Sequence, residues 1–148
     1  DPSWAQVVLT TDVTGTLPIV TTGGTTTPGV IMASATYAPV RSAEANLDVN
    51  VTISDSQYLR VGKTVSVSGR FTADPTTPAT QTTFGISLPV ASAFTKSDDL
   101  AGVAFSGNIA GMGGEVMADQ TNDRANVTWV SGDVTAQTWS YIYLYQVK

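Results

Sequence analysis

Two residue types on which much of enzyme chemistry depends, cysteine and histidine, are missing from this chain. Without cysteine there is no disulfide framework and no thiolate metal site. Without histidine, the commonest metal ligand and the commonest general base are both absent. The sequence therefore predicts no cofactor and no metal centre, and it disfavours an enzyme.

Charge is also scarce. Charged residues make up 13% of the 148 residues, which is about half their share in an average globular protein. The formal net charge is -5, and a negative surface repels phosphate backbones, so we expect no binding to nucleic acid. No apolar run approaches the roughly 18 residues of a membrane-spanning helix, so we expect no insertion into a membrane.

The chain does contain many threonines and valines, and its apolar residues often recur with a period of two. Residues 45–53 alternate between apolar and polar, which is typical of a half-buried strand. Gly62-Lys63 separates two β-rich runs and predicts a hairpin with a type II′ turn. A second hairpin is expected where residues 115–118 and 124–130 flank a polar loop. Together these short strands predict an all-β fold, an antiparallel β-sandwich of jelly-roll type.

The last expected strand, residues 138–147, is apolar on both of its faces. One face carries an aromatic row, made of Trp139, Tyr141, Tyr143 and Tyr145. The other face carries Ile142 and Leu144. A strand that is apolar on both faces is normally covered on both faces. We therefore expect the aromatic row to face the core. The other face needs the rim of a second sheet or a partner chain, and we predict that Ile142 and Leu144 contact another subunit.

The first 36 residues differ from the rest of the chain. Residues 1–36 are rich in Thr, Gly and Pro without a sustained period, which predicts an extended N-terminal arm or spacer, followed by a globular domain over residues 37–148. Trp4 is the exception, and we expect it to anchor the arm to its own domain or to a neighbouring subunit. Because the chain opens on Asp1 without Met, we interpret it as a fragment or a processed product.

Two acidic loops are candidate binding sites. One holds Asp98 and Asp99, and the other holds Asp119, Asn122 and Asp123. Such carboxylates and amides can hold a hard cation or form hydrogen bonds to a glycan, but neither spacing matches a known calcium loop. Hydrogen bonds from turn aspartates to backbone amides are the alternative explanation. Asp123 and the arginine that follows it can likewise form an internal ion pair or stabilise the hairpin.

Trp129 and Trp139 have the ring surface that stacks on sugars. Both also lie in register with apolar strand positions, Trp129 with Ala125 and Val127. The core is therefore the favoured place for both rings, and a glycan contact is the alternative for Trp129.

Four motifs occur in a fixed order between Tyr58 and Val147, namely "YLRVGKTVSVSGRFTADP", "GISLPVASAF", "GVAFSGNIAGMGGEVMADQTNDRANVTWV" and "YIYLYQV". Together they resemble the C-terminal domain of tail fibres and related tail-associated structural proteins of bacteriophages and prophages. The stretch "VTGTLPIVTTGG" at residues 13–24 is similar to the spacer that precedes the terminal knob of such fibres. The resemblance implies a virion structural protein, often trimeric, placed where the particle meets the host surface. It transfers no catalytic motif.

From these features we expect the tip of a trimeric tail fibre that contacts other virion proteins and host-surface polysaccharide. The candidate glycan contacts are Asp98, Asp99, Asp119, Asn122 and Trp129. A homotrimer would cover the apolar side of the last strand. The alternative is a capsid decoration protein on the particle exterior, whose N-terminal arm laces subunits together. A depolymerase is disfavoured, because no histidine activates the hydroxyl nucleophiles and the acids lie mainly in turns.

Overall fold

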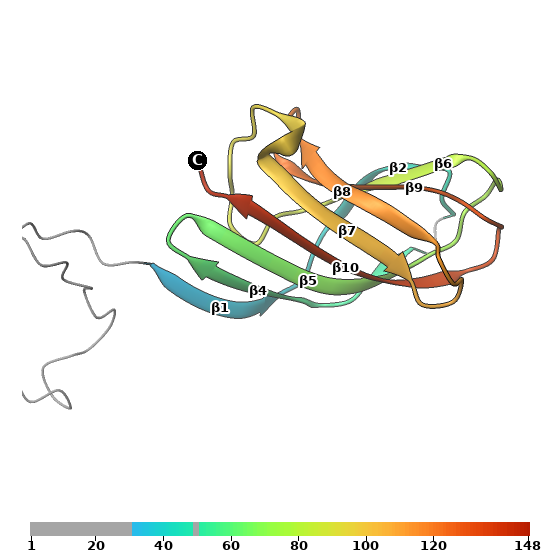
Figure 1. Ribbon diagram of the computed structural model, residues 1–148, viewed down its shortest axis with the longest axis horizontal. Coiled ribbons are helices and arrows are strands. Elements are labelled where there is room, and N and C mark those ends of the chain that lie inside the picture. Colours follow the sequence, from blue (N-terminus) through green and yellow to red (C-terminus); the bar gives the residue numbers. More distant parts are fainter. Residues whose placement is uncertain (1–30, 49–50) are drawn as a thin grey trace, which may run out of the picture.

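The computed structural model describes residues 31–48 and 51–148 (Figure 1). This part forms ten β-strands and one short 3-10 helix, and it contains no α-helix. Every strand pairing in it is antiparallel. The prediction of an all-β antiparallel fold is therefore confirmed. Residues 1–30 of the expected arm, including Trp4, lie outside the described residues. No helix among the described residues is long and apolar enough to cross a bilayer.

The ten strands form one hydrogen-bonded sheet. They are β1 (Met32–Tyr37), β2 (Arg41–Ala45), β3 (Thr52–Ile53), β4 (Ser56–Val61), β5 (Thr64–Ala73), β6 (Gln81–Ile86), β7 (Leu100–Ser106), β8 (Gly113–Asp119), β9 (Arg124–Val130) and β10 (Gln137–Gln146), with the helix η1 at Ser97–Asp99. Their order across the sheet is β1-β4-β5-β10-β7-β8-β9-β6-β2, and β3 pairs with β5. The C-terminal strand β10 therefore lies inside the sheet, between β5 and β7.

The sheet curls into a half-barrel because its two edge strands are neighbours in the chain. β1 and β2 are joined only by residues 38–40, so the opposite edges of the sheet approach each other there. The Tyr37 hydroxyl at this link donates a hydrogen bond to the carbonyl of Ser87, at 3.3 Å. The curl also brings β5 opposite β6, where the rings of Phe71 and Phe84 lie 4.8 Å apart. The core is thus enclosed by two halves of a single sheet (Figure 1).

Both predicted hairpins are confirmed. Val61 pairs with Thr64 at the end of β4 and the start of β5, which leaves Gly62 and Lys63 as the two-residue turn. Gly62 has a φ of 61° and Lys63 has no positive φ, as a type II′ turn requires. β8 and β9 form the second hairpin around residues 120–123.

The long strand expected over residues 45–53 is not continuous. β2 ends at Ala45, and β3 contains only Thr52–Ile53. Between them Asn46 has a left-handed φ of 57°. Its side-chain amide donates to the carbonyl of Thr77 at 2.9 Å and accepts from the Thr77 amide at 2.8 Å. This asparagine pins a distant loop, and that requirement overrides the local alternation that favoured one strand.

All of β1 except its last residue lies within the segment that the sequence assigned to the arm. Met32–Tyr37 pair along their whole length with β4, so the sheet extends across the expected boundary at residue 37. The Tyr37 ring packs edge-on against Tyr58, and its hydroxyl lies 3.0 Å from that of Tyr143. Alanine and serine fill much of this strand, which leaves too little apolar contrast for a period of two to be recognised.

An aromatic row on β10 fills the centre of the core. Its members are Trp139, Tyr141, Tyr143 and Tyr145, all at most 3% exposed. Their cross-strand neighbours are small: Tyr141 pairs with Gly69 on β5, and Tyr143 pairs with Gly102 on β7. A Cβ atom at Gly102 would collide with the Tyr143 Cβ and with the carbonyl oxygen of Ile142. The large rings fit because the flanking strands leave this space free.

We predict that Gly102→Ala destabilises the protein, because the new methyl group meets backbone atoms that cannot move away. Overpacking of this kind costs about 1–3 kcal/mol. Gly107→Ala is the matched control, since the nearest atom to its Cβ would lie 3.5 Å away. Urea denaturation measures both variants. Equal midpoints for the two would contradict the packing described here.

Candidate interaction face

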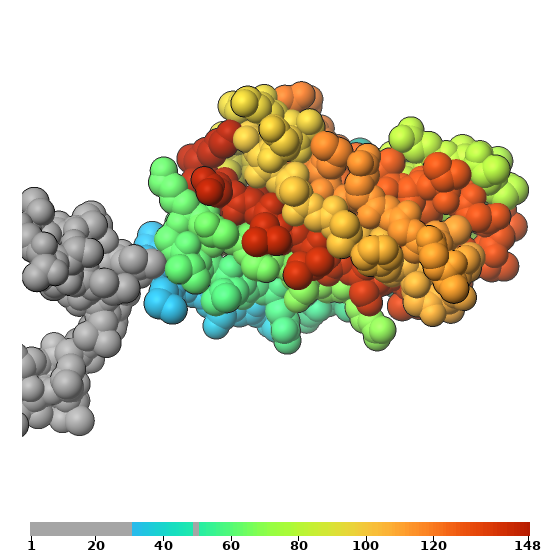
Figure 2. All heavy atoms as spheres, in the orientation of Figure 1, coloured from blue at the N-terminus to red at the C-terminus, as the bar shows by residue number. Residues whose placement is uncertain are grey.

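The side of the sheet that faces away from the core is apolar at its centre. Ile142 and Leu144 on β10 pair with Val103 and Ala101 on β7, and Phe105 lies one pair further along. We call these five residues the apolar strip. Its four larger members are 42–59% exposed. Figure 2 shows this face, with the red atoms of β10 between the green of β5 and the yellow of β7. Ile142 and Leu144 thus lie on an exposed apolar surface, and their contact with another subunit stays a prediction.

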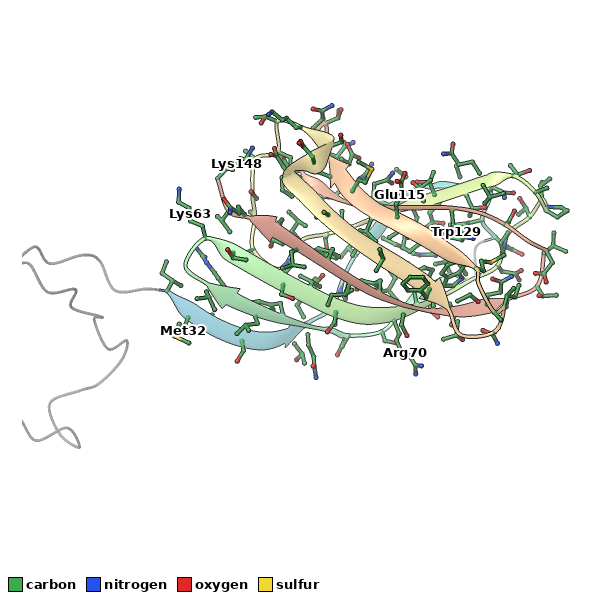
Figure 3. The ribbon with its side chains drawn as sticks, viewed as in Figure 1. Met32, Lys63, Arg70, Glu115, Trp129 and Lys148 are labelled. Atoms are coloured by element: carbon green, nitrogen blue, oxygen red, sulfur yellow. The ribbon has the colours of Figure 1, made fainter. Side chains whose placement is uncertain are left out.

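One charged residue borders the strip on each side. Arg70 points outward from β5, and Glu115 points outward from β8 (Figure 3). The Arg70 Nε lies 3.4 Å from the Ser140 hydroxyl. Neither Arg70 nor Glu115 forms an ion pair within the described part of the chain. The face therefore has an apolar centre and two flanks of opposite charge.

Beyond β5 the same face becomes a shallow groove of about 520 Å³. We call it the hydroxyl groove. Its outward side chains are Ser34, Thr36, Gln57, Leu59, Ser66 and Ser68. Within residues 31–48 and 51–148, the serine, threonine and glutamine side chains of this groove form no hydrogen bond. Each can donate and accept, so the groove offers neutral hydrogen-bonding groups to a ligand.

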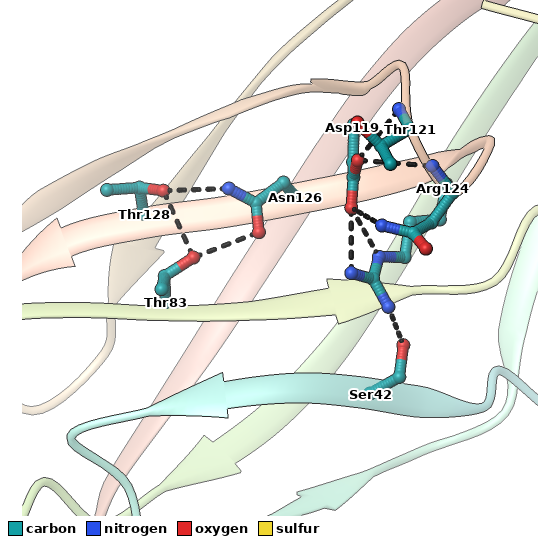
Figure 4. Close-up of polar contacts among 8 residues, drawn as sticks. Ser42, Thr83, Asp119, Thr121, Arg124, Asn126 and Thr128 are labelled. Atoms are coloured by element: carbon teal, nitrogen blue, oxygen red, sulfur yellow. Dashed lines mark hydrogen bonds and ion pairs between the residues drawn. The ribbon is translucent and has the colours of Figure 1, made fainter.

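The outward polar residues of β6 and β9 differ, because they bond to one another. The Thr83 hydroxyl donates to the side-chain Oδ1 of Asn126 at 2.9 Å, and the Asn126 Nδ2 donates to the Thr128 hydroxyl at 3.2 Å (Figure 4). The Thr128 and Thr83 hydroxyls complete the ring at 3.4 Å. The polar side chains of this surface already form hydrogen bonds with one another. A ligand would therefore add less hydrogen-bonding free energy here than in the hydroxyl groove.

Asp119 and Asn122 have structural roles in the β8–β9 turn. The Asp119 carboxylate accepts from the backbone amides of Thr121 and Asn122 and from the Asn122 side chain, at 2.9–3.2 Å. It also pairs with Arg124 at 2.7 Å. Burial alone would raise the pKa of Asp119, but the bonds from Asn122 and Arg124 outweigh it and hold the pKa below its usual value. The predicted alternative of a hairpin stabiliser describes this loop, although the arginine pairs with Asp119 and not with Asp123.

Asp99 organises the other acidic loop. Its carboxylate accepts from the backbone amides of Thr95 and Lys96 at 2.7 and 3.0 Å. It also forms an ion pair with the Lys148 ammonium at 2.6 Å. The bond from Lys148, followed by those from Thr95 and Lys96, holds the pKa of Asp99 far below its usual value. Asp98 lies beside it on a shallow pocket of about 380 Å³.

Both acidic loops lie at the end of the fold where residue 31 is found. The Ile31 carbonyl accepts from the Gly62 amide at 2.7 Å, and the Val147 amide donates to the Lys63 carbonyl at 2.8 Å. Figure 3 shows Met32, Lys63 and Lys148 together at this end. The loops at 74–80, 107–112 and 131–136 lie at the opposite end.

Trp129 is not available to a sugar, which corrects its candidacy as a glycan contact. It is 3% exposed. Its ring lies 5.9 Å from that of Phe71 and 5.0 Å from that of Trp139. The curl of the sheet places β9 opposite β5 and thereby closes the core over this ring. The favoured prediction of a core position is confirmed.

The described residues hold few groups that could move a proton. Burial raises the pKa of the Tyr145 phenol to about 12, and its hydroxyl donates to the Val90 carbonyl at 2.7 Å. Burial also raises the pKa of Tyr141, whose hydroxyl lies 2.6 Å from that of Ser56. These phenols remain neutral near pH 7. In residues 31–48 and 51–148 no three acidic side chains converge as a metal site would require.

Comparison with known proteins found no matching family model, no matching curated protein and no matching solved structure. The function is therefore inferred from the surface of this chain and from its motifs.

We predict that Asp99→Asn lowers the free energy of unfolding at neutral pH. The variant should also lose less stability than the parent protein when the pH falls. A carboxyl whose pKa is depressed by folding stabilises the fold above its unfolded pKa of about 3.9, and this contribution is lost as the pH falls toward the folded value. Urea midpoints between about pH 7 and about pH 2.5 measure the effect. Asp98→Asn is the control, because no hydrogen bond or ion pair of its side chain is found in the described region. If both variants lost stability with acid as the parent does, Asp99 would not be the group responsible.

Proposed function

We propose that this chain is a non-catalytic structural protein of a bacteriophage virion, the trimeric tip of a tail fibre that contacts glycan on the host surface. The observation that carries the proposal is the apolar strip, exposed on a protein that has little charge elsewhere. Monomeric soluble proteins rarely expose a large contiguous apolar patch to water. The four motifs that resemble tail-fibre domains, and that occur in a fixed order along the chain, support the same assignment. The proposal includes a relation of this fold to the jelly-roll knobs of such fibres.

The glycan contact is assigned to the hydroxyl groove. The carboxylates of Asp99 and Asp119 already accept hydrogen bonds from backbone amides and form ion pairs with Lys and Arg side chains of their own chain. Both loops also lie at the end of the fold near residue 31, which would face the fibre shaft if the preceding residues form the spacer. The groove lies on the flank, where a polysaccharide strand has access. Its uncharged hydroxyl and amide groups match a neutral sugar, whose hydroxyls also donate and accept.

Capsid decoration is the second candidate. One observation favours it: β1 is an edge strand, paired only with β4 among the described strands. An unpaired edge offers backbone groups to another chain, and residues 1–30 precede this strand directly. A neighbouring subunit's arm could pair there and lace a lattice together.

The location of the protein in the particle separates the two candidates. We expect antibody labelling of intact virions, viewed by electron microscopy, to mark the distal end of the tail fibre in multiples of three copies. Label distributed over the capsid surface would favour decoration and contradict the fibre proposal. Absence from purified virions would exclude both.

We predict that Gln57→Ala weakens binding to neutral polysaccharide by about tenfold, because it removes a donor and an acceptor from the hydroxyl groove. Binding is measured to polysaccharide extracted from host cells and immobilised on a sensor surface. Gln81→Ala is the matched control, since Gln81 is an exposed glutamine that points outward from β6. Equal binding by the two variants would remove the groove from the proposal.

A further inference from the structure

The flanks of the apolar strip carry opposite charges at nearly the same height. In the strand register, Arg70 on β5 lies opposite Ser140 on β10, and Ser140 lies opposite Phe105 on β7. Glu115 pairs with Val103, one outward position further along β7. Outward residues on one strand repeat every ~6.8 Å, so the two charges are offset by about that distance along the strands. Long arginine and glutamate side chains can span such an offset.

A cyclic assembly joins one flank of each subunit to the other flank of the next. Suppose that the symmetry axis is parallel to β10 and β7 and faces the apolar strip. Then β5 of one copy lies beside β8 of its neighbour. The positive flank of every copy would then meet a negative flank. The described region provides neither Arg70 nor Glu115 with an ion-pair partner of its own.

The width of the face suits three copies. The strands β5, β10, β7 and β8 are neighbours in the sheet, and four strands at a spacing of ~4.8 Å span about 19 Å. Three sheets of this width form a triangular prism whose axis lies about 5.5 Å from each sheet, close to half of the ~10 Å that separates packed sheets. Side chains of the size of Leu144 and Val103 would therefore fill the centre without a channel.

We propose that three copies of this chain pack as such a prism, with the apolar strip on the three-fold axis and Arg70 of each copy paired with Glu115 of the next. The arrangement rests on the proposed homotrimer and specifies its interface. Apolar residues then occupy the dry centre, and charged residues occupy the corners, as in stable protein interfaces. The part of the hydroxyl groove on β1 and β4, which includes Gln57, lies beyond the β5 corner and faces outward.

Charge reversal in the full 148-residue chain tests the pairing. We expect Arg70→Glu and Glu115→Arg each to weaken trimer association by about tenfold or more, because like charges then meet at all three corners. The double variant Arg70→Glu/Glu115→Arg should restore most of the association. Lys63→Glu is the control, a charge reversal at the hairpin tip between β4 and β5. Sedimentation equilibrium measures the oligomer, and far-ultraviolet circular dichroism verifies folding.

Leu144→Asp provides a second measurement, since three carboxylates on the axis should yield a folded monomer or an aggregate. A parent protein that is monomeric at every concentration would refute the homotrimer and with it the prism. A trimer that survives both single reversals and Leu144→Asp would refute the prism and leave the homotrimer standing. Weakened single variants without recovery in the double variant would refute the Arg70–Glu115 pairing.

Discussion

The rest of this structure depends on the packing of one aromatic row against strands that make room for it. The rings of Tyr141 and Tyr143 occupy the space left by Gly69 and Gly102 on the two flanking strands. This match sets the register of β10, because a shift by one residue would turn the rings to the outer side and Leu144 inward. The same constraint that fills the core therefore also places the apolar strip on the surface.

The surface has two kinds of region. In one kind the polar side chains form hydrogen bonds or ion pairs within the chain, and in the other kind the side chains have no such partners among the described residues. On β9 and in the acidic loops, polar side chains bond to partners in the same chain, as Asn126 does with Thr83 and as Asp99 does with Lys148. These contacts stabilise turns and strands, and they leave little for a ligand. The hydroxyl groove and the apolar strip have no such internal partners. Interaction with glycan and with other copies is therefore assigned to the face of the sheet and not to its loops.

Much of the fold could be predicted from local pattern. The turn at Gly62, the hairpin at residues 120–123 and the two-faced last strand depend on neighbours in sequence, and the structure has all three. The break after Ala45 could not be predicted, since it depends on hydrogen bonds between Asn46 and Thr77, 31 positions further along the chain. The candidate site was harder to predict from the sequence than the fold. Sequence pointed to acidic loops, because carboxylates are conspicuous there, while a groove of serines and threonines has no motif.

The sequence by itself determined the fold class, the absence of histidine and cysteine chemistry, and the apolar character of both faces of β10, since these follow from composition and from a period of two. Only the tertiary structure decided which side chains share a surface. Arg70 and Glu115 are 45 positions apart in the chain, yet the order β5-β10-β7-β8 places them on either side of one apolar strip. For Trp129 the sequence favoured the core but left a glycan contact open, and the curl that brings β9 opposite β5 decided between the two. Strand order and curvature arise from contacts between distant segments, and no local pattern contains them.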